Sequence, residues 1–578
     1  MHMGQIKNAI ERHEIISFDI YDTLLVRPYV QPSDLFRHLE LKEASPGFCR
    51  SRVDAERASR KLNFETTYDD IYHSIKEEFK RLKDVELDYE LSLTRANSEM
   101  LEAFQFALAK GKRVVLLSDM YLPSGFLKEL LLKNGYLGYE MLFVSCEHKC
   151  NKHSGGLFKV ALDYLGADPK SILHIGDNRR SDFKVPTSMG MDAICYDSMM
   201  TQYFNANPRE GRCYRRSKSL DMSILIAMDS LHWKGSLSKE GGNGYWYEAS
   251  YRFGGPIIYS YLRFLEHNLD EGDNQIYFIA RDGYNLMHIC RLLSKSPRKC
   301  VYLYAPRVFR YLKGPEMGIN REYTSWIVRS FQFNDEVRKL TDGLKLSSKV
   351  CNDLYHRNSE LFERIRIGEM EKYERYIKNS IATEGSVFIV DVTTLKFSSQ
   401  RLVKAFLDSN QEVMGCYHTV LSKRFDGRYV NFHDRGGKLI NWSKVNVSEF
   451  FMSSPEPPIC GLNDDFTPIF KTGYSDHESF RISLQDDILK GETDYVQDMM
   501  DAFGDKLPDI SSEPMRQWMD VLIKRRSHLD KKNLLNMRWA PDFDHNEYHY
   551  LIFNWKDIRY HVTVKLFGMA RNMISRIW

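Results

Sequence analysis

Three apolar stretches of the chain lead to residues that can act as a nucleophile, a hydrogen-bond donor or a metal ligand. The stretch IISF leads to Asp19, VVLLS ends in Ser118, and ILHIG leads to Asp177. Each stretch is short and rich in Ile, Leu and Val, which is typical of a buried strand in a parallel sheet. Because the ligand crevice of an open parallel sheet lies at the carboxyl ends of its strands, we expect these side chains to converge there.

Residues near these strand ends complete a set suited to phosphoryl transfer. An aspartate can attack phosphorus and form an aspartyl-phosphate, while a hydroxyl and a lysine can hold the phosphoryl oxygens as charge develops. Further carboxylates can hold Mg²⁺, which prefers oxygen ligands. Two interpretations of Asp182 stay open. It either binds the metal, or it orients Lys152 or caps a helix. In chain order the candidates are Asp19, Thr23, Ser118, Lys152 in the segment NKHSGGLF, Asp177 and Asp182.

The elements that must position these residues alternate between short apolar runs and helical stretches. This alternation favours an α/β fold with parallel sheets. Between residues 27 and 96 the chain is charged and has helical spacing, as in ASRKLNFETTYDDIYHSIKEEFKRL, so we expect a helical insert there. The runs expected as strands in the first part are IISFDI, RVVLLSD, MLFVSC, SILHIGD and DAICYD.

The order Asp…Thr, Ser, Lys and GD-x₄-D resembles the four motifs of the haloacid-dehalogenase (HAD) superfamily of hydrolases. The resemblance implies a Rossmann-like domain over residues 1–205, a helical cap at about 27–96, and Mg²⁺ as the cofactor. It implies that Asp19 is the nucleophile and that Thr23, Ser118 and Lys152 assist it. It further implies that the metal is held by Asp19, the backbone carbonyl of Tyr21, Asp177 and Asp182.

The chain departs from the family pattern two residues after the nucleophile. Phosphatases of the family usually carry an aspartate there, which protonates the leaving oxygen, whereas this chain has Tyr21. Asp22 is a poor substitute, because successive side chains of an extended segment point to opposite faces. Dehalogenases of the family tolerate a tyrosine, but they need no metal, so the acids of GD-x₄-D favour phosphoryl transfer with leaving groups of low pKa. The alternative is a weakened domain that serves as a binding or regulatory module.

A second α/β domain is expected over residues 223–474. Its strand candidates are QIYFIARD, CVYLYAPR, SVFIVDV and VMGCYHTVL. Asp391 is followed by the hydroxyl-rich loop TTLKFSS and a helix, and a helix N-terminus can hold an anion. The layout resembles type I phosphoribosyltransferases, although it lacks their second acid and their loop glycine. A sugar-phosphate or nucleotide-sugar pocket and a plain ion pair at the loop stay open, and the candidate residues are Arg281, Asp282, Arg307 and Asp391.

The strings FDIYDTLL, LLSDMYLP and YFIARDGYNL resemble a group of two-domain, HAD-type bacterial hydrolases. That group is associated with capsule or lipopolysaccharide biosynthesis and with glycosyltransferases. The resemblance, which covers about residues 14–460, therefore implies a phosphorylated, sugar-linked small-molecule substrate and glycosyltransferase partners. The sequence does not identify the substrate or the oligomeric state.

The rest of the chain is expected to supply a linker at 206–222 and a mostly helical region at 475–578. In the last helix Leu566, Met569, Met573 and Ile577 share a face that would pack on the protein itself or contact a membrane surface. A formal net charge of +3 in 578 residues gives no case for nucleic acid. The ten cysteines are scattered and lack zinc-type spacing, which is typical of free thiols in a reducing compartment. The sequence shows no apolar run that could be a leader or a membrane span, so we expect a cytoplasmic protein.

Overall fold

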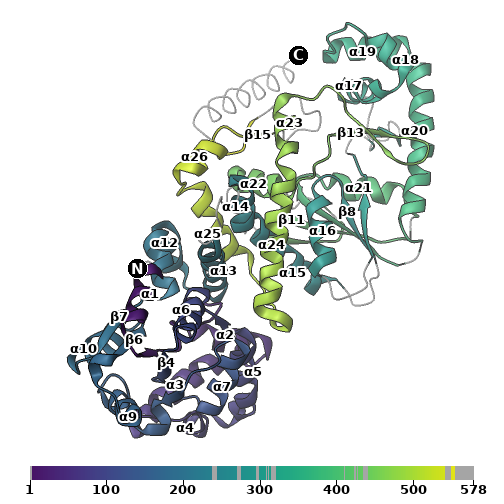
Figure 1. Cartoon of the computed structure of the whole chain (residues 1–578). Coiled ribbons are helices and arrows are strands. Elements are labelled where there is room, and N and C mark those ends of the chain that lie inside the picture. The colour runs from purple at the N-terminus through teal and green to yellow at the C-terminus, as the bar shows by residue number, and fades with distance from the viewer. Residues whose placement is uncertain are drawn as a thin grey trace, which may run out of the picture. The chain divides into compact units, whose positions relative to one another are not determined.

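The structure is a computed structural model in which the chain forms two compact units (Figure 1). The first unit comprises residues 1–242 and 498–508, and the second comprises 243–497 and 509–578. The residues that the structure describes are 3–236, 244–269, 275–293, 299–306, 309, 311–313, 321–383, 385–408, 410–421, 425, 427–433, 441–539 and 549–552.

The first unit contains a five-stranded, all-parallel sheet in the order β5-β4-β1-β6-β7. The chain builds β1, β4 and β5 toward one edge and then returns to add β6 and β7 beside β1. The topological switch point, where ligands bind in such sheets, therefore lies between β1 and β6. All five predicted strands are present: β1 (Ile15–Phe18), β4 (Arg113–Ser118), β5 (Met141–Val144), β6 (Ile172–Gly176) and β7 (Asp192–Cys195).

Apolar side chains on both faces of this sheet bury it between helices. Ile15 and Leu117 belong to a core cluster that includes Phe158 of α9 (Gly156–Leu165). On the opposite face, the ring of Phe18 packs 5.9 Å from that of Phe104 in α6 (Ser98–Ala109). Burial on both faces explains why these strands are continuous apolar runs rather than alternating ones.

The predicted helical insert at 27–96 is also present. It leaves and re-enters the sheet domain through a short antiparallel pair, β2 (Leu25–Val26) and β3 (Arg95–Ala96). Its helical elements are α2 (Asp34–Lys42), α3 (Phe48–Leu62), α4 (Tyr68–Ser74), the short 3₁₀ segment Glu77–Leu82 and α5 (Lys83–Leu93).

The second unit has its own five-stranded parallel sheet, in the order β12-β11-β10-β8-β9. The four predicted strands correspond to β8 (Gln275–Ile279), β9 (Lys299–Leu303), β10 (Val387–Thr394) and β11 (Val413–Val420). The edge strand β12 (Tyr429–His433) was not predicted. The α/β class with two parallel sheets is therefore confirmed.

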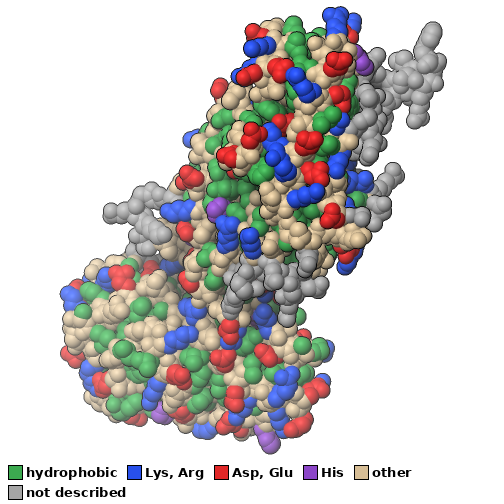
Figure 2. Space-filling view, turned by 90° about the vertical axis from the view of Figure 1, so that its right-hand side faces the viewer, with side chains coloured by type: hydrophobic (Ala, Val, Ile, Leu, Met, Phe, Trp, Pro, Cys, Tyr) green, Lys and Arg blue, Asp and Glu red, His purple; other side chains and the backbone are tan. Residues whose placement is uncertain are grey.

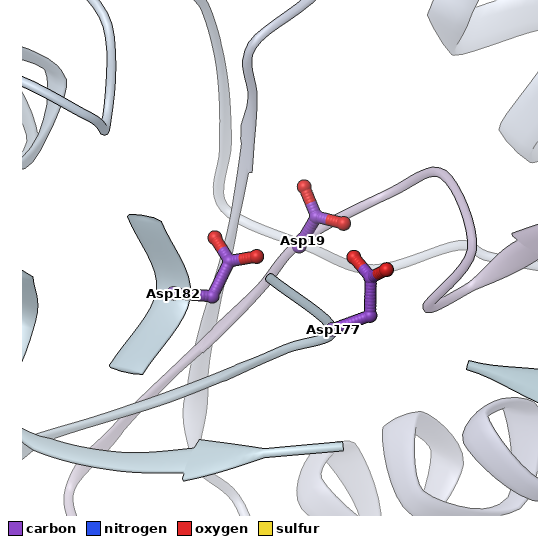
Figure 3. A group of neighbouring side chains, drawn as sticks. All are labelled: Asp19, Asp177 and Asp182. Carbon is purple, nitrogen blue, oxygen red and sulfur yellow. The ribbon is translucent and has the colours of Figure 1, made fainter. Parts of the chain in front are cut away.

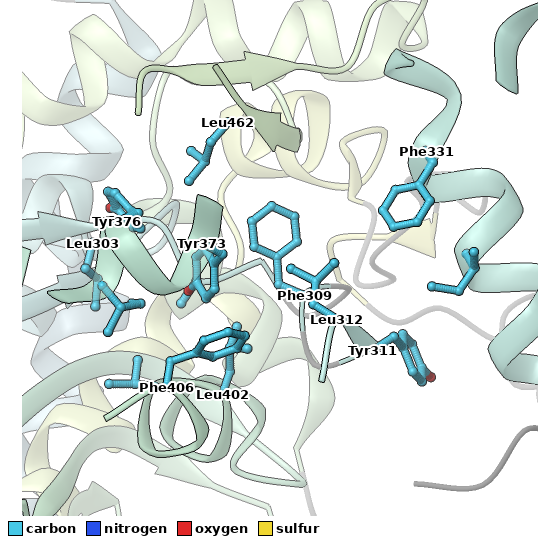
Figure 4. Close-up of a cluster of buried hydrophobic side chains, with 14 of the residues drawn as sticks. Leu303, Phe309, Tyr311, Leu312, Phe331, Tyr373, Tyr376, Leu402, Phe406 and Leu462 are labelled. Carbon is cyan, nitrogen blue, oxygen red and sulfur yellow. The ribbon is translucent and has the colours of Figure 1, made fainter. Parts of the chain in front are cut away.

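A large aromatic core stabilises the second unit (Figure 4). Tyr373 of α20 (Ser359–Ser380) lies at its centre, with its ring edge-on to Phe309 at 4.7 Å and to Phe406 at 4.9 Å. Fully burying an aromatic ring contributes about 1.5–3 kcal/mol, so this cluster is a principal source of the unit's stability.

The described residues after 475 are mainly helical, as expected, with α23 (Asp476–Ser483), α24 (Gln485–Phe503), α25 (Ser512–Ile523) and α26 (His528–Leu534). The unit boundaries differ from the predicted domain limits, because residues 498–508 belong to the first unit. The segment 206–222, expected to be a linker, instead forms α12 (Pro208–Ser217) and the start of α13 (Leu220–Ser236). It is structured because its apolar residues fall on one helical face, where Cys213 and Tyr214 are buried.

The surface carries charges of both signs. On the face shown in Figure 2, Lys and Arg side chains are interspersed with Asp and Glu, in line with the small net charge. Among the described residues, no helix combines the length and the apolar character needed to cross a bilayer. The C-terminal helix predicted to contain Leu566, Met569, Met573 and Ile577 lies outside the described residues, so its two alternatives stay predictions.

Candidate active site

Three carboxylates meet at the switch point of the first sheet (Figure 3). Asp19 directly follows β1, and Asp177 directly follows β6. Asp182 lies in the first turn of the helical segment Arg179–Lys184 and turns back toward both. One oxygen of each carboxylate lies within 4.8 Å of the others. Of the residues that the structure describes, this is the one group of three or more side chains suited to hold a metal ion.

The carboxylate of Asp19 is buried and held on both oxygens. Its Oδ2 accepts a hydrogen bond of 3.1 Å from the hydroxyl of Thr23, and its Oδ1 accepts one from the ammonium of Lys152. A tight turn brings Thr23 back toward Asp19. In this turn the backbone amide of Leu25 donates to the carbonyl of Ile20 at 2.8 Å, and Asp22 adopts a left-handed conformation (φ 60°). The turn and the two hydrogen bonds therefore set the direction in which the Asp19 carboxylate points.

Lys152 is fixed at both ends. Its backbone amide donates to Oδ1 of Asp119 at 2.8 Å, and its ammonium forms ion pairs with Asp19 and, at 2.7 Å, with Oδ1 of Asp182. Burial alone would lower the pKa of Lys152, but the two carboxylates outweigh it and hold the pKa well above its usual value. The lysine therefore stays charged within the site.

Burial disfavours the ionised form of the carboxylates, and the cation beside two of them opposes this. Burial raises the pKa of Asp19, with Asp182 and Asp177 adding to the effect of burial and Lys152 reducing it. Burial, with Asp22 and Asp182 nearby, raises the pKa of Asp177 to about 7. Three carboxylates against one ammonium leave a formal excess of two negative charges. A divalent cation bound by oxygen ligands would balance this excess.

Asp182 contacts Lys152, as the orienting interpretation of this residue requires. Its Oδ1 binds Lys152 and also accepts from Nε2 of His174 at 3.2 Å, while its Oδ2 accepts from the backbone amide of Asn178 at 2.9 Å. Burial opposes its ionisation, but Lys152 and His174 outweigh burial and hold the pKa of Asp182 well below its usual value. Its position near Asp19 and Asp177 leaves the metal-ligand interpretation open as well.

Ser118 lies at the end of a strand, and Tyr21 lies in the turn after Asp19. Ser118 is the buried last residue of β4, next to β1 in the sheet. The ring of Tyr21, in the turn after Asp19, lies 4.1 Å below the guanidinium of Arg27, which pairs with Glu90 at 2.8 Å. The role of the Tyr21 carbonyl as a metal ligand stays a prediction.

Several residues of this site were missed by sequence reasoning. Asp119 holds the backbone of Lys152, and Ser17 and His174 support Asp182 from within the sheet. The available signal was a polar residue inside an apolar strand, Ser17 in IISF and His174 in ILHIG. Asn151 was also missed. Its amide donates to Glu65 of the helical insert at 2.6 Å, which places the insert directly beside Lys152.

Two of the candidates of the second unit, Arg281 and Asp391, have partners within that unit. Arg281, after β8, pairs with Glu478 of α23 at 3.0 Å, and the predicted loop ion pair of Arg281 with Asp282 stays a prediction. Asp391 lies inside β10, where it accepts from the amide of Val392 at 2.8 Å and from the hydroxyl of Ser399 in α21 (Ser398–Ala405). Asp282 directly follows Arg281, and Arg307 lies outside the described residues. An anion pocket in this unit stays a prediction.

No family model matches the chain, and no curated protein matches it. Among solved structures it is similar to a HAD-family enzyme from Bacteroides thetaiotaomicron, with 17% identity and a TM-score of 0.27 over 32% of this chain and 94% of that one. The magnesium complex of that enzyme also matches, with 16% identity and a TM-score of 0.24 over the same shares of the two chains. An L-2-haloacid dehalogenase from Xanthobacter autotrophicus matches with 15% identity and a TM-score of 0.24, over 31% of this chain and 76% of that one. Likeness at this level carries no inference about activity, which must come from the geometry of the site.

Proposed function

We propose that the first unit is a Mg²⁺-dependent phosphohydrolase or phosphotransferase of the HAD type that acts through an aspartyl-phosphate on Asp19. The observation that supports this most strongly is the buried Asp19 carboxylate, held by Thr23 and Lys152 within 4.8 Å of two further carboxylates. A carboxylate can attack phosphorus only if it is oriented and if the charge that develops on the phosphoryl group is neutralised.

Each side chain has a role that follows from its contacts. Thr23 orients Asp19 toward the phosphorus, and Lys152 and Ser118 hold the phosphoryl oxygens. Asp19, Asp177 and the carbonyl of Tyr21 would hold Mg²⁺, with Asp182 beside them. The metal, when bound, would neutralise negative charge and orient the phosphoryl group. Attack by Asp19 forms the bond to phosphorus and releases the leaving group, and water or an acceptor hydroxyl then takes the phosphoryl group from Asp19.

The preferred leaving group follows from Tyr21. A general acid works best when its pKa lies near the working pH, but burial raises the pKa of Tyr21 well above its usual value. Tyr21 is therefore a poor proton donor. We expect substrates whose leaving group departs as a stable anion, such as a phosphoanhydride or an acyl phosphate.

We extend the proposal to a sugar-phosphate or nucleotide-linked substrate in surface polysaccharide biosynthesis, with glycosyltransferases as partners. This extension is supported only by the resemblance of the sequence strings to such bacterial hydrolases. A regulatory module for the second unit is the alternative that Tyr21 suggests. The complete pairing of Asp19 with Thr23 and Lys152 favours the enzyme over that alternative.

The proposal is tested with aryl phosphates whose leaving phenols span a range of pKa, and with a panel of sugar phosphates, with and without Mg²⁺. Asp19→Asn should lower kcat by about 10⁴-fold or more, whereas the matched control Asp163→Asn, on the exposed face of α9, should leave it unchanged. Activity that survives in Asp19→Asn would overturn the assignment.

Tyr21→Asp separates the enzyme from the regulatory alternative, with Tyr21→Asn as the control for lost ring packing. In the wild type the rate should fall steeply as the pKa of the leaving phenol rises. Tyr21→Asp should flatten this dependence, because it restores a proton donor. Activity that appears only in Tyr21→Asp would favour the regulatory alternative.

A further inference from the structure

His174 is a fully buried polar residue in the middle of the first sheet. It lies on β6 in register with Ser17 on the neighbouring strand β1, and the two side chains share a face. Nδ1 of His174 lies 2.8 Å from the hydroxyl of Ser17, and Nε2 lies 3.2 Å from Oδ1 of Asp182. The ring of Phe158 packs edge-on against the imidazole at 4.9 Å. The ring is therefore held on three sides.

The partners determine which ring nitrogen donates. An ionised carboxylate can only accept, so Nε2 must carry the hydrogen that is donated to Asp182. The hydroxyl of Ser17 can rotate and donate to Nδ1, which completes the pairing of a neutral ring. Asp182 thus selects the tautomer, and Ser17 completes the pairing of the ring.

A continuous chain of hydrogen bonds leads from this histidine to the nucleophile candidate. His174 binds Oδ1 of Asp182, the same oxygen binds the ammonium of Lys152 at 2.7 Å, and that ammonium binds Asp19. All members of the chain are buried, and hydrogen bonds are electrostatically stronger in such a low-dielectric interior than in water.

We infer that His174 is a positioning residue for phosphoryl transfer: it holds Asp182 against Lys152 so that the ammonium stays on Asp19. The inference rests on the proposed function of this site. His174 contacts Ser17, Asp182 and Phe158, and the hydrogen-bond chain links it to Asp19 through Asp182 and Lys152. It acts as a second layer of support, and loss of such support at metal sites typically costs about 10–100-fold in affinity or activity.

Three substitutions separate positioning from packing. His174→Phe keeps an aromatic ring against Phe158 and removes both hydrogen bonds. His174→Gln places an amide donor near the original Nε2 and can still bind Asp182. Ser17→Ala, the matched control, removes the bond on the other side of the ring and leaves the contact with Asp182 possible.

The first readout is Mg²⁺-dependent binding of beryllofluoride, a mimic of a phosphoryl group on aspartate, followed by ¹⁹F NMR. The second is kcat and KM with an activated aryl phosphate. We expect His174→Phe to weaken beryllofluoride binding and lower kcat by about 10–100-fold with little change in KM. We expect His174→Gln to recover most of this loss and Ser17→Ala to cost only a few-fold. Wild-type values in a folded His174→Phe protein, or no recovery in His174→Gln, would overturn the inference.

Crystal structures of the variants give a readout that does not depend on activity. Oδ1 of Asp182 should move away from Lys152 in His174→Phe and stay in place in His174→Gln. An unmoved Asp182 in His174→Phe would overturn the positioning role even if the wild type binds no beryllofluoride. If the wild type binds no beryllofluoride, that result counts against the proposed function instead. If His174→Phe does not fold, His174→Asn, whose amide reaches toward Ser17 but not Asp182, replaces it.

Discussion

Gly176, the last residue of β6, leaves the space that the Asp182 side chain fills. A Cβ atom at position 176 would lie 2.5 Å from Cγ and 2.7 Å from Oδ2 of Asp182, well inside normal contact. Asp182 cannot retreat freely, because Lys152, His174 and a backbone amide hold its carboxylate. We therefore predict that Gly176→Ala displaces Asp182 and, with it, Lys152.

The expected magnitudes follow from this crowding. Overpacking a buried site by one methyl group typically costs about 1–3 kcal/mol of stability. A catalytic group displaced by about 1 Å can cost on the order of 10²-fold in rate. Gly176→Ala should therefore destabilise the first unit by about 1–3 kcal/mol and lower kcat by about 10²-fold.

The assay combines aryl phosphate hydrolysis with hydrogen exchange of the amides in β1 and β6, which reports the stability of the first unit alone. The matched control is Gly125→Ala in α7 (Ser124–Lys133), where a new Cβ has no atom within 4 Å. If Gly176→Ala matched Gly125→Ala in both exchange and kcat, the packing of Asp182 against Gly176 would contribute nothing to stability or to catalysis, which would refute the prediction.

Three further predictions concern buried charge. Lys152→Met leaves buried carboxylates without their cation, so Mg²⁺ should raise the melting temperature of this variant more than that of the wild type; an equal shift would contradict the charge argument. Arg52→Met in the helical insert leaves Glu86 buried without its cation, although the hydroxyl of Tyr72 still donates to it, and should cost about 3–5 kcal/mol in urea unfolding of the first unit. Arg52→Met/Glu86→Gln should partly recover this loss, and additive losses would refute the pairing. In the second unit, burial lowers the pKa of His418 to about 3. In the unfolded chain His418 has a pKa near 6.5, so between pH 6.5 and 3 the unfolded state binds a proton that the folded state does not. The free energy of unfolding should therefore fall by up to about 1.4 kcal/mol per pH unit below pH 6.5. His418→Phe should lessen this fall between pH 6.5 and 5, and parallel profiles would contradict it.

The sequence predicts the parts of this fold that depend on local pattern. The nine predicted strands stand out as short apolar runs, and most of them are buried on both faces; β7 and β9, at the edges of their sheets, are only partly buried. The strand β12 was missed because YVNFH alternates polar and apolar residues at the edge of the sheet. The segment 206–222 was taken for a linker because its basic, polar composition hid the buried face of α12.

In the site, too, the sequence predicts only the residues whose position depends on local pattern. Asp19, Ser118 and Asp177 could be found because each lies at the end of a strand whose position is visible in the sequence. His174 and Ser17 could not be assigned a role, because their pairing depends on which strands are neighbours and on their register. The return of residues 498–508 to the first unit is likewise a property of tertiary packing, which no local pattern records.

The most direct test of the central claim is to trap the covalent intermediate on Asp19. The protein is mixed with Mg²⁺ and an activated phosphate donor, reduced with borohydride, which converts an aspartyl-phosphate to homoserine, and analysed by peptide mass spectrometry. We predict homoserine at position 19, dependent on both Mg²⁺ and the donor. Turnover of the donor with Asp19 unmodified and with Asp19→Asn fully active would contradict the account.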